Sequence, residues 1–348
     1  MGEKRSEWFV PVRRSLTFDR LAWILVVILL HALAAGNCPA QTSSPVQDGK
    51  LEDAERLRVV DGAIANVRKF YVDAEIGQKV ADALLAHQRS GEDNDVTDGR
   101  TFADLLTRQM RDVSHDRHLV VAYSQEILPE HRAEPTPESN ARYKKWLEEN
   151  HCLFETVEVL PHAIGYLKLG GFPNPEFCGT TAIAAMATLN NADAIIFDLR
   201  ENRGGDGQMG SLLAAYLFDH PEYWFSPREN TTEHSWTKSP VNGSKLADKP
   251  AYVLTSASTW SAAEQFCFDL KALKRATLVG ETTGGGAHAG VFHRIDDHFG
   301  IGISEVKPIN PYSENDWEGT GVDPDVKVKA EEALKEALKL AEARLAKK

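Results

Sequence analysis

The chain has 348 residues, of which 42% are hydrophobic and 26% are charged, and its formal net charge at pH 7 is −12. This length and composition suit a globular protein of two or three domains whose core needs neither disulfides nor metal for stability. The acidic residues are scattered and no basic stripe interrupts them, which argues against a nucleic-acid partner.

The first 40 residues have the pattern of a secretory signal peptide. Basic residues precede an apolar run from Leu21 to Leu30, and small residues follow it, with Ala34 and Ala40 as possible cleavage positions. The run is shorter than the ~20 residues of a spanning helix, although a membrane anchor remains the alternative. We expect a signal peptide over 1–40, a flexible linker over 41–50, export to the periplasm or secretion, and no membrane association after cleavage.

Residues 51–123 have the periodicity of three amphipathic helices followed by a strand. The helical period ends near Met110 and gives way to Val113-Ser-His-Asp-Arg-His-Leu-Val-Val-Ala-Tyr, where two histidines stand at the junction. We expect an N-terminal helical domain over 51–123. Residues 124–150 are rich in Pro, Glu and Lys, which indicates a connector or a short exposed helix.

From residue 151 onward, apolar strands alternate with helices, which predicts an α/β core over 151–329. An amphipathic C-terminal helix is expected over 330–348. The predicted strands are 154–160, 164–169, 192–199, 252–254 and 276–279, with a hairpin over 291–303, and the predicted helices are 180–189, 207–217 and one that begins at about Ser261.

Ser261 stands where a strand-like run passes into a predicted helix. This placement suits a nucleophile, because the unpaired N–H groups of a helix N-terminus can stabilise an oxyanion. The alternative is a capping box made by Ser261 and Glu264, in which the hydroxyl only satisfies helix N–H groups. The stretch alone leaves both roles open.

A glycine-rich turn, Phe197-Asp-Leu-Arg-Glu-Asn-Arg-Gly-Gly-Asp-Gly, follows a predicted buried strand. Such a turn can present N–H groups to an anion, or it can simply be a tight turn that needs glycine. Its glycine spacing matches neither a dinucleotide fingerprint nor a P-loop.

Histidine spacing gives little indication of a metal site. His115 and His118 form an H-x-x-H pair outside a helical pattern, and His288, His293 and His298 show no ligand-like grouping. We therefore predict no metal and no cofactor. Ser235-Trp-Thr-Lys238 matches a Ser-x-x-Lys motif by chance, since the prolines and glycines around it deny it a helix.

Three cysteines remain after the expected cleavage. An exported compartment permits a disulfide between Cys152 and Cys178, and buried free cysteines are the alternative. Cys267 lies on the apolar face of the predicted helix and is expected in the core.

Several motifs together resemble one protein family. Thr255-Ser-Ala-Ser-Thr-Trp-Ser-Ala-Ala-Glu and Arg275-Ala-Thr-Leu-Val-Gly-Glu-Thr-Thr-Gly-Gly resemble the nucleophile region of the C-terminal-processing (tail-specific) serine proteases. Asp198-Leu-Arg-Glu-Asn-Arg-Gly-Gly resembles the D-L-R-x-N-x-G-G loop of the same family. In the processing branch a lysine base follows the serine by 25 positions, and here that position is Gly286. A Ser–Lys dyad is therefore not expected.

A second branch of the family contains the tricorn-type core proteases and the modules of interphotoreceptor retinoid-binding protein (IRBP). Its D-x-H-L motif resembles Asp116-Arg-His118-Leu119, and its W-E-G-x-G-V-x-P-D motif resembles Trp317 to Asp325. The resemblance implies a ClpP/crotonase-like α/β core with an N-terminal helical bundle. The PDZ domain of many processing proteases does not fit into residues 124–150.

The resemblance also implies an activity and a set of residues. It implies a serine peptidase that hydrolyses peptides or unfolded polypeptides through an acyl-enzyme, with Ser261 as nucleophile, His118 as general base and Glu318 as the group that orients the imidazole. We expect activity to fall on the acid side as His118 protonates, at pH of about 6 to 7.

The oxyanion of such a reaction is expected to bind the backbone N–H of Ala262 together with that of Gly204 or Gly205. A different function on the same scaffold is a non-catalytic carrier of lipophilic ligands. The presence of serine, histidine and glutamate together favours the peptidase.

Overall fold

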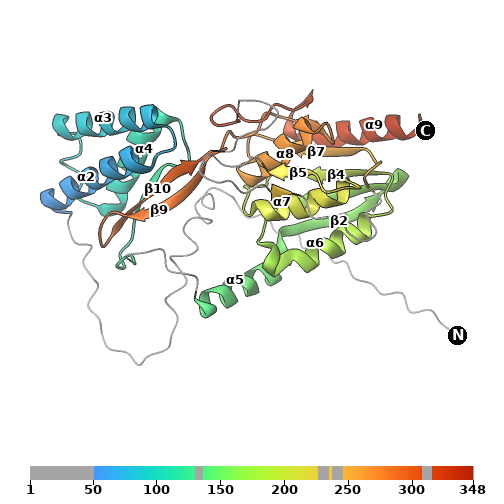
Figure 1. Cartoon of the computed structure of the whole chain (residues 1–348), viewed down its shortest axis with the longest axis horizontal. Coiled ribbons are helices and arrows are strands. Elements are labelled where there is room, and N and C mark those ends of the chain that lie inside the picture. The colour runs from blue at the N-terminus through green and yellow to red at the C-terminus, as the bar shows by residue number, and fades with distance from the viewer. Residues whose placement is uncertain (1–50, 130–135, 226–234, 237–245, 308–315, 348) are drawn as a thin grey trace. The chain divides into compact units, whose positions relative to one another are not determined.

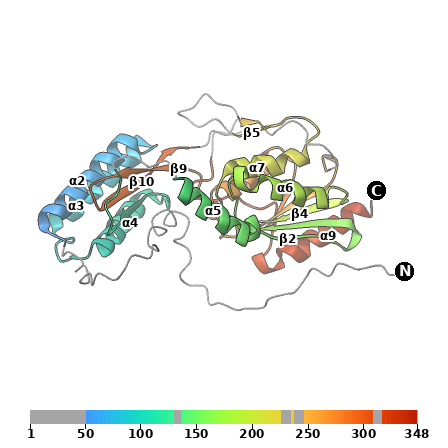
Figure 2. The same ribbon diagram turned by 90° about the horizontal axis from the view of Figure 1, so that it is seen from below.

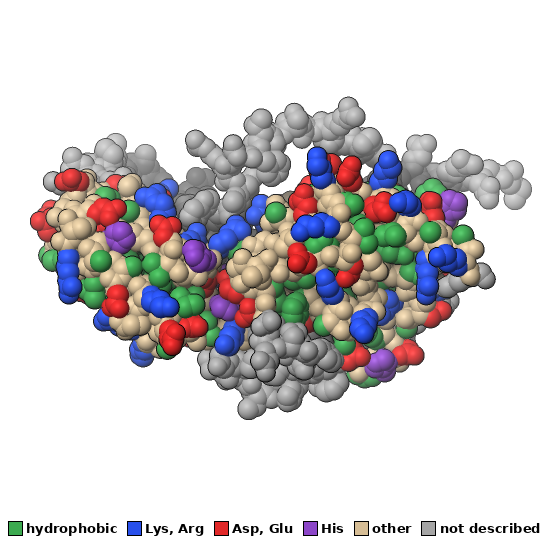
Figure 3. All heavy atoms as spheres, turned by 90° about the horizontal axis from the view of Figure 1, so that it is seen from above, with side chains coloured by type: hydrophobic (Ala, Val, Ile, Leu, Met, Phe, Trp, Pro, Cys, Tyr) green, Lys and Arg blue, Asp and Glu red, His purple; other side chains and the backbone are tan. Residues whose placement is uncertain are grey.

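The computed structural model describes residues 51–129, 136–225, 235–236, 246–307 and 316–347 (Figure 1). The expected signal peptide and linker lie outside the described residues, as does most of the polar stretch before residue 246. Among the described residues, no helix combines the length and the apolar character needed to cross a membrane. Acidic and basic side chains are interspersed over the face shown in Figure 3.

The protein is a mixed α/β protein. The helices are α2 (Asp53–Phe70), α3 (Ala74–Ser90), α4 (Gly99–Ser114), α5 (Pro137–Glu149), α6 (Pro175–Leu189), α7 (Gly207–Ala214), α8 (Ala262–Ala272) and α9 (Ala333–Leu345). The strands are β1 (Val120–Tyr123), β2 (Phe154–Leu160), β3 (Ile164–Leu169), β4 (Ala194–Asp198), β5 (Tyr223–Phe225), β6 (Ser235–Trp236), β7 (Ala251–Thr255), β8 (Thr277–Gly280), β9 (Ala289–Arg294), β10 (Phe299–Val306) and β11 (Val326–Lys327).

The larger sheet has six strands in the order β11-β8-β7-β4-β3-β2, with only β2 antiparallel to its neighbour. Successive residues of a strand face opposite sides, so Ile195 and Phe197 of β4 pack with α6, α7 and α8. Ala194 and Ile196 pack with α9 on the other side. Figure 2 shows α9 across the sheet from α6 and α7. Both faces are therefore covered, as parallel sheets require.

The N-terminal helices α2, α3 and α4 pack around a separate core that also contains strands. β10 pairs with β9 and, on its other edge, with β1 in a three-stranded antiparallel sheet. The apolar residues Phe299, Ile301 and Ile303 alternate along β10 and join this helical core.

This arrangement corrects the assignment of the hairpin to the α/β core over 151–329. The hairpin forms as expected, but β10 pairs with β1, which lies about 180 positions earlier in the chain, with Val120 opposite Gly302. Local periodicity predicts a strand without revealing its partner. The core around α2, α3 and α4 therefore contains strands from both expected ranges, β1 from 51–123 and β10 from 151–329.

Helix α6 begins five positions before the predicted start at residue 180. Pro175 occupies its first turn and the Asn174 side chain accepts a hydrogen bond from the Glu176 N–H at 2.7 Å, which is an N-terminal cap. Cys178 in this helix forms a disulfide with Cys152, and Cys267 is free and buried. The disulfide ties α6 to the start of β2.

Candidate active site

Two loops at the carboxyl ends of the neighbouring parallel strands β4 and β7 are fastened to one another. The Thr259 hydroxyl donates to the Leu199 carbonyl at 2.9 Å, and the Trp260 N–H donates to the Asn202 carbonyl at 3.0 Å. These bonds hold the glycine-rich turn of residues 198–205 against the segment that leads to α8. The two sequence motifs are thus one structural unit.

Ser261 lies at the N-cap of α8 with φ 55° and ψ −122°, a conformation that side-chain-bearing residues rarely adopt. Its N–H donates to the Glu264 carboxylate at 2.9 Å, so the capping-box partner is in place. A Cβ atom on Gly204 would lie 2.9 Å from the Ser261 Cβ and 2.7 Å from the Trp260 carbonyl oxygen. Only glycine allows the turn to approach Ser261 this closely.

The turn and the helix end offer free N–H groups beside Ser261. Among the described residues, neither the Ala262 N–H nor the Gly205 N–H donates a hydrogen bond. The Gly204 N–H instead donates to Asn202 Oδ1 at 2.8 Å. Of the two glycines expected from the sequence, Gly205 therefore has the available donor.

Glu264 is fully buried and fixes a second loop beside Ser261. Besides the Ser261 N–H, its carboxylate accepts hydrogen bonds from the Thr283 hydroxyl at 2.5 Å and from the N–H groups of Gly285 and Gly286 at 2.7 Å. Burial raises the pKa of Glu264, and these hydrogen bonds act against that rise.

Gly286 occupies the position where the processing branch carries its lysine. A Cβ atom there would lie 2.2 Å from the indole Cζ2 of Trp260. The indole thus fills the space that a lysine side chain at residue 286 would need to enter. The geometry agrees with the absence of a Ser–Lys dyad in the sequence.

His118 follows α4 and leads into β1, and its ring lies 5.3 Å from the ring of Trp260, the residue before Ser261. Its backbone N–H donates to Asp116 Oδ1 at 2.8 Å, while its buried Nδ1 has no hydrogen bond and is 3.7 Å from the same oxygen. Burial lowers the pKa of His118, although Asp116 opposes this. Among the described residues, no hydrogen bond joins His118 to Ser261.

Two carboxylates lie beside the imidazole, that of Asp116 buried and that of Glu318 mostly buried. Asp116, His118 and Glu318 each have one nitrogen or oxygen atom that could bind a metal ion, and these three atoms all lie within 4.8 Å of one another. Asp116 is fully buried and accepts the Tyr71 hydroxyl at 3.1 Å, and burial raises the pKa of that hydroxyl. Glu318 Oε2 accepts the N–H groups of Ala287 and His288 at 2.6 and 2.9 Å.

Burial and the nearby charge of Asp116 raise the pKa of Glu318 to about 7. The expected orienting carboxylate thus lies near His118 without a hydrogen bond to it, and Asp116 is the closer of the two. Asp116 is part of the motif that resembles the family, but nothing in its sequence position predicts its contact with the imidazole.

His288 completes the cluster, although its spacing in the sequence does not predict a place beside His118. Its Nε2 lies 3.3 Å from Asp316 Oδ2, and its Nδ1 lies 3.8 Å from Glu318 Oε2 and 4.0 Å from Asp116 Oδ2. Burial lowers the pKa of His288, but the hydrogen bond to Asp316 and the charges of Glu318 and Asp116 outweigh burial and raise it overall. No sequence spacing connects His288 with His118.

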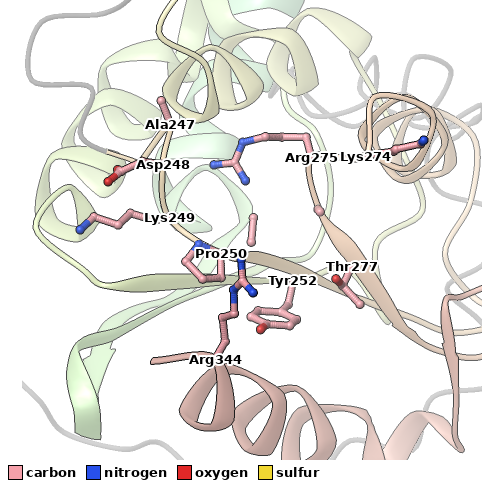
Figure 4. Close-up of a pocket in the computed structure, with 11 residues that line it drawn as sticks. Ala247, Asp248, Lys249, Pro250, Tyr252, Lys274, Arg275, Thr277 and Arg344 are labelled. Carbon is pink, nitrogen blue, oxygen red and sulfur yellow. The ribbon is translucent and has the colours of Figure 1, made fainter. Parts of the chain in front are cut away.

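A pocket elsewhere in the protein is separate from this cluster (Figure 4). It lies beside the first residues of β7, Ala251 and Tyr252, whereas Ser261 follows the other end of that strand. Its lining includes the charged side chains Lys249, Arg275 and Arg344. Such a lining does not suit a lipophilic ligand.

Comparisons with known proteins agree with these features. Residues 163–328 match the model of peptidase family S41, and residues 54–158 match the N-terminal domain of peptidase S41 in eukaryotic IRBP. A carboxyl-terminal-processing protease of Synechocystis is 29% identical over 163 residues, which cover 47% of this chain and 37% of the relative. The chloroplastic carboxyl-terminal-processing peptidase 2 of Arabidopsis thaliana is 28% identical over 164 residues, or 47% and 31% of the two chains.

Two solved structures share the fold. The tricorn protease has a TM-score of 0.53 at 14% identity, over 84% of this chain and 37% of that chain. A lipoprotein of Streptococcus agalactiae has a TM-score of 0.53 at 14% identity, over 83% and 96%. The chain belongs to peptidase family S41. Its predicted α/β fold and family resemblance are confirmed, and its matches span about a third of the length of the two curated relatives.

Proposed function

We propose that this protein is a serine peptidase that cleaves peptide bonds through an acyl-enzyme on Ser261. One observation carries the proposal: Ser261 is held in a strained conformation beside the free N–H group of Ala262, next to a tryptophan whose ring lies 5.3 Å from the imidazole of His118. Strained residues at a helix N-terminus are concentrated at functional sites. A serine with only a capping role has no need of this conformation, since N-cap residues ordinarily adopt extended backbone angles.

The N–H groups of Ala262 and Gly205 form the oxyanion hole in this proposal. Attack by the Ser261 hydroxyl on a carbonyl carbon places negative charge on the carbonyl oxygen, and both N–H groups are free to bind it. Each such donor contributes roughly 3–4 kcal/mol in comparable sites. Gly204 serves a different purpose, because it lets the turn approach Ser261.

His118 takes the proton of Ser261 and later delivers it to the leaving amine. Its pKa is lowered by burial, so the neutral imidazole that can accept a proton predominates at neutral pH. The hydrogen bond between the two side chains forms when substrate closes the site, as catalytic hydrogen bonds in free enzymes are often long. Glu318 and Asp116 then stabilise the imidazolium through their charges.

Peptides or unfolded polypeptides are the proposed substrates, and the periplasm or the cell exterior is the proposed location. The disulfide between Cys152 and Cys178 supports an oxidising compartment. The relatives that match are named carboxyl-terminal-processing protease and carboxyl-terminal-processing peptidase. No cofactor takes part in the proposed reaction.

A serine-directed fluorophosphonate tests the proposal, with the labelled residue identified by peptide mapping. We expect one adduct, on Ser261, that disappears in Ser261→Ala and persists in Ser258→Ala. An adduct on another residue, or peptide cleavage that survives Ser261→Ala, would overturn the assignment.

A further inference from the structure

The cluster around His118 contains three buried polar atoms that have no hydrogen bond: His118 Nδ1, His288 Nδ1 and Glu318 Oε1. Two of them lie near Asp116, because His118 Nδ1 is 3.7 Å from one Asp116 oxygen and His288 Nδ1 is 4.0 Å from the other. His288 Nδ1 is also 3.8 Å from Glu318 Oε2. Asp116, His118 and Glu318 thus form a compact group, and His288 lies beside its two carboxylates.

Such an arrangement is unfavourable without a positive charge inside it. The Asp116 side chain is fully buried and that of Glu318 is 14% exposed, so water screens their repulsion poorly. A proton on His288 or Glu318 is one remedy, and a metal cation is the other. The ligand types decide which cation fits, since imidazole nitrogens suit zinc, whereas magnesium prefers oxygen ligands alone.

The four side chains offer the ligand types of a tetrahedral zinc site in a more open arrangement. Zinc bonds of about 2.0–2.2 Å to nitrogen and oxygen place ligand atoms roughly 3.3 Å apart. The separations of 3.7 to 4.0 Å require the side chains to close by about 0.5 Å, and the 4.8 Å limit for Asp116, His118 and Glu318 requires closure by up to about 1.5 Å. His288 already has the supporting contact of a zinc ligand, because its Nε2 faces the Asp316 carboxylate at 3.3 Å.

We propose that Asp116, His118, His288 and Glu318 bind a zinc-type divalent cation, and that this cation switches the peptidase off. The inhibitory half rests on the proposed function, whereas the binding half does not. Zinc on His118 Nδ1 leaves the ring proton on Nε2. The imidazole then donates a hydrogen bond where the reaction needs it to accept the Ser261 proton.

Protons compete with the cation at this site. His118 faces Asp116 and His288 together with the guanidinium groups of Arg111 and Arg117, which oppose a cation. His288 faces Asp316, Glu318 and Asp116, and Glu318 also raises the pKa of Tyr71. The three carboxylates outnumber the two arginines, so zinc binds at neutral pH and is displaced as the imidazoles and Glu318 take up protons in acid.

Calorimetric titration of the tag-free Ser261→Ala protein with ZnCl2 tests the binding half without reference to activity. We expect one zinc ion per chain at pH 7.5, at least tenfold weaker binding at pH 5.5, and no comparable binding of MgCl2. His118→Gln and His288→Gln should each weaken binding by at least about tenfold. Glu318→Gln provides a further variant if one of these does not fold, as judged by thermal unfolding.

His220 supplies a matched control. It is an exposed histidine flanked by Asp219 at 2.6 Å and Glu222 at 3.1 Å, so it has the same ligand types without the buried geometry. His220→Gln should leave zinc binding unchanged. Absence of stoichiometric binding, or binding lost in His220→Gln and retained in folded His118→Gln and His288→Gln, would overturn the proposed site.

Peptide hydrolysis by the wild-type protein tests the inhibitory half. Zinc should inhibit at the concentrations that saturate the Ser261→Ala protein, and a chelator should restore activity without reducing it when added alone. Full activity with zinc bound would overturn the switch. Failure of the fluorophosphonate to label Ser261 would refute the proposed peptidase while leaving the zinc titration interpretable.

Discussion

The two sides of the proposed active site are held in place by different forces. Around Ser261 the contacts are hydrogen bonds of 2.5 to 3.0 Å, and most of them involve backbone groups. Around His118 the neighbours are charged side chains. His118 Nδ1 lies 3.7 Å from Asp116, and His288 Nδ1 lies 4.0 Å from Asp116 and 3.8 Å from Glu318. The serine side is therefore fastened by hydrogen bonds that leave the N–H groups of Ala262 and Gly205 free, whereas the histidine side contains unpaired side-chain atoms.

This difference indicates how the two sides contribute. Donors that are already fixed lose little on binding an oxyanion, which is the advantage of a preorganised serine side. A cluster with unpaired atoms responds to a proton, a substrate or a cation, because each changes its charge balance. The nucleophile thus lies on the rigid side of the site, and the base lies on the side whose charge responds to protons, substrate or cations.

Replacing the nucleophile should have the largest effect. Ser261→Ala should reduce peptide hydrolysis by at least about 10⁴-fold, because no other group forms the acyl-enzyme. Ser261→Gly should be equally inactive yet more stable by roughly 1 kcal/mol, since glycine adopts the backbone angles of residue 261 without strain. Denaturant unfolding measures the second effect. Equal or lower stability of Ser261→Gly would show that the serine side holds no strain.

Neutralising the carboxylate on the base side should have the next largest effect. Glu318→Gln, assayed at pH 8.5, should lower kcat by about 10²–10⁴-fold with little change in KM, because the imidazolium forms only on the way to the transition state. Asp323→Asn, an exposed carboxylate in the same segment, is the control and should keep normal activity. A Ser261→Ala, Glu318→Gln double variant much worse than Ser261→Ala would remove Glu318 from the mechanism.

Glu264→Gln tests the rigidity of the serine side. The glutamine NH2 group would face N–H donors that now bind a carboxylate, so the folded state should lose roughly 2–4 kcal/mol. Catalysis should suffer as well, because Ser261 and the loop of residues 283–286 lose their common anchor. Urea unfolding and steady-state kinetics measure the two losses. A Glu264→Gln variant with normal stability would contradict the claim that the hydrogen bonds of Glu264 hold the serine side together.

The buried charge of Glu318 should make stability depend on pH. Its pKa is about 7 in the folded protein against an ordinary 4.5, so between these values the folded state holds a proton that the unfolded state has released. Protonated Glu318 therefore stabilises the folded state. Its contribution to the free energy of unfolding is complete below pH 4.5 and is lost as the pH rises through 7, by about 3 kcal/mol in total. Glu318→Gln should lack this part of the pH dependence in urea unfolding at pH 5 and pH 8.5. Identical pH dependence in both proteins would contradict the raised pKa.

Tyr71→Phe should have the smallest effect. It removes the hydroxyl that donates to Asp116 at 3.1 Å, which should lower stability by about 1 kcal/mol and change kcat by less than tenfold. Thermal unfolding and peptide hydrolysis provide the measurements. A loss of activity as large as that of Glu318→Gln would place Tyr71 in the reaction itself.

The same contrast explains what the sequence could predict. The serine side rests on two contiguous motifs, so Ser261, Ala262 and the glycine turn were found together, and strands β2 and β3 have the bounds predicted for them. The choice between Gly204 and Gly205 depends on the side chain of Asn202, which sequence spacing does not show.

The histidine side joins residues from three separate segments, 116–118, 288 and 316–318. His118 and Glu318 are 200 positions apart, and the two were associated only through a family resemblance. His288 contributes through its contacts with Asp316 and Glu318, and no periodicity encodes such contacts. The pairing of the β9–β10 hairpin is likewise not predictable from the sequence, because its partner strand β1 is distant in the chain.

The rate of fluorophosphonate labelling at Ser261, measured from pH 5 to pH 9, tests most directly whether His118 activates the serine. The wild-type rate should rise with pH as the cluster around His118 loses protons. His118→Ala should label at least about 10³-fold more slowly, whereas His220→Gln should match the wild type. Labelling of a folded His118→Ala protein at the wild-type rate would contradict the proposed mechanism.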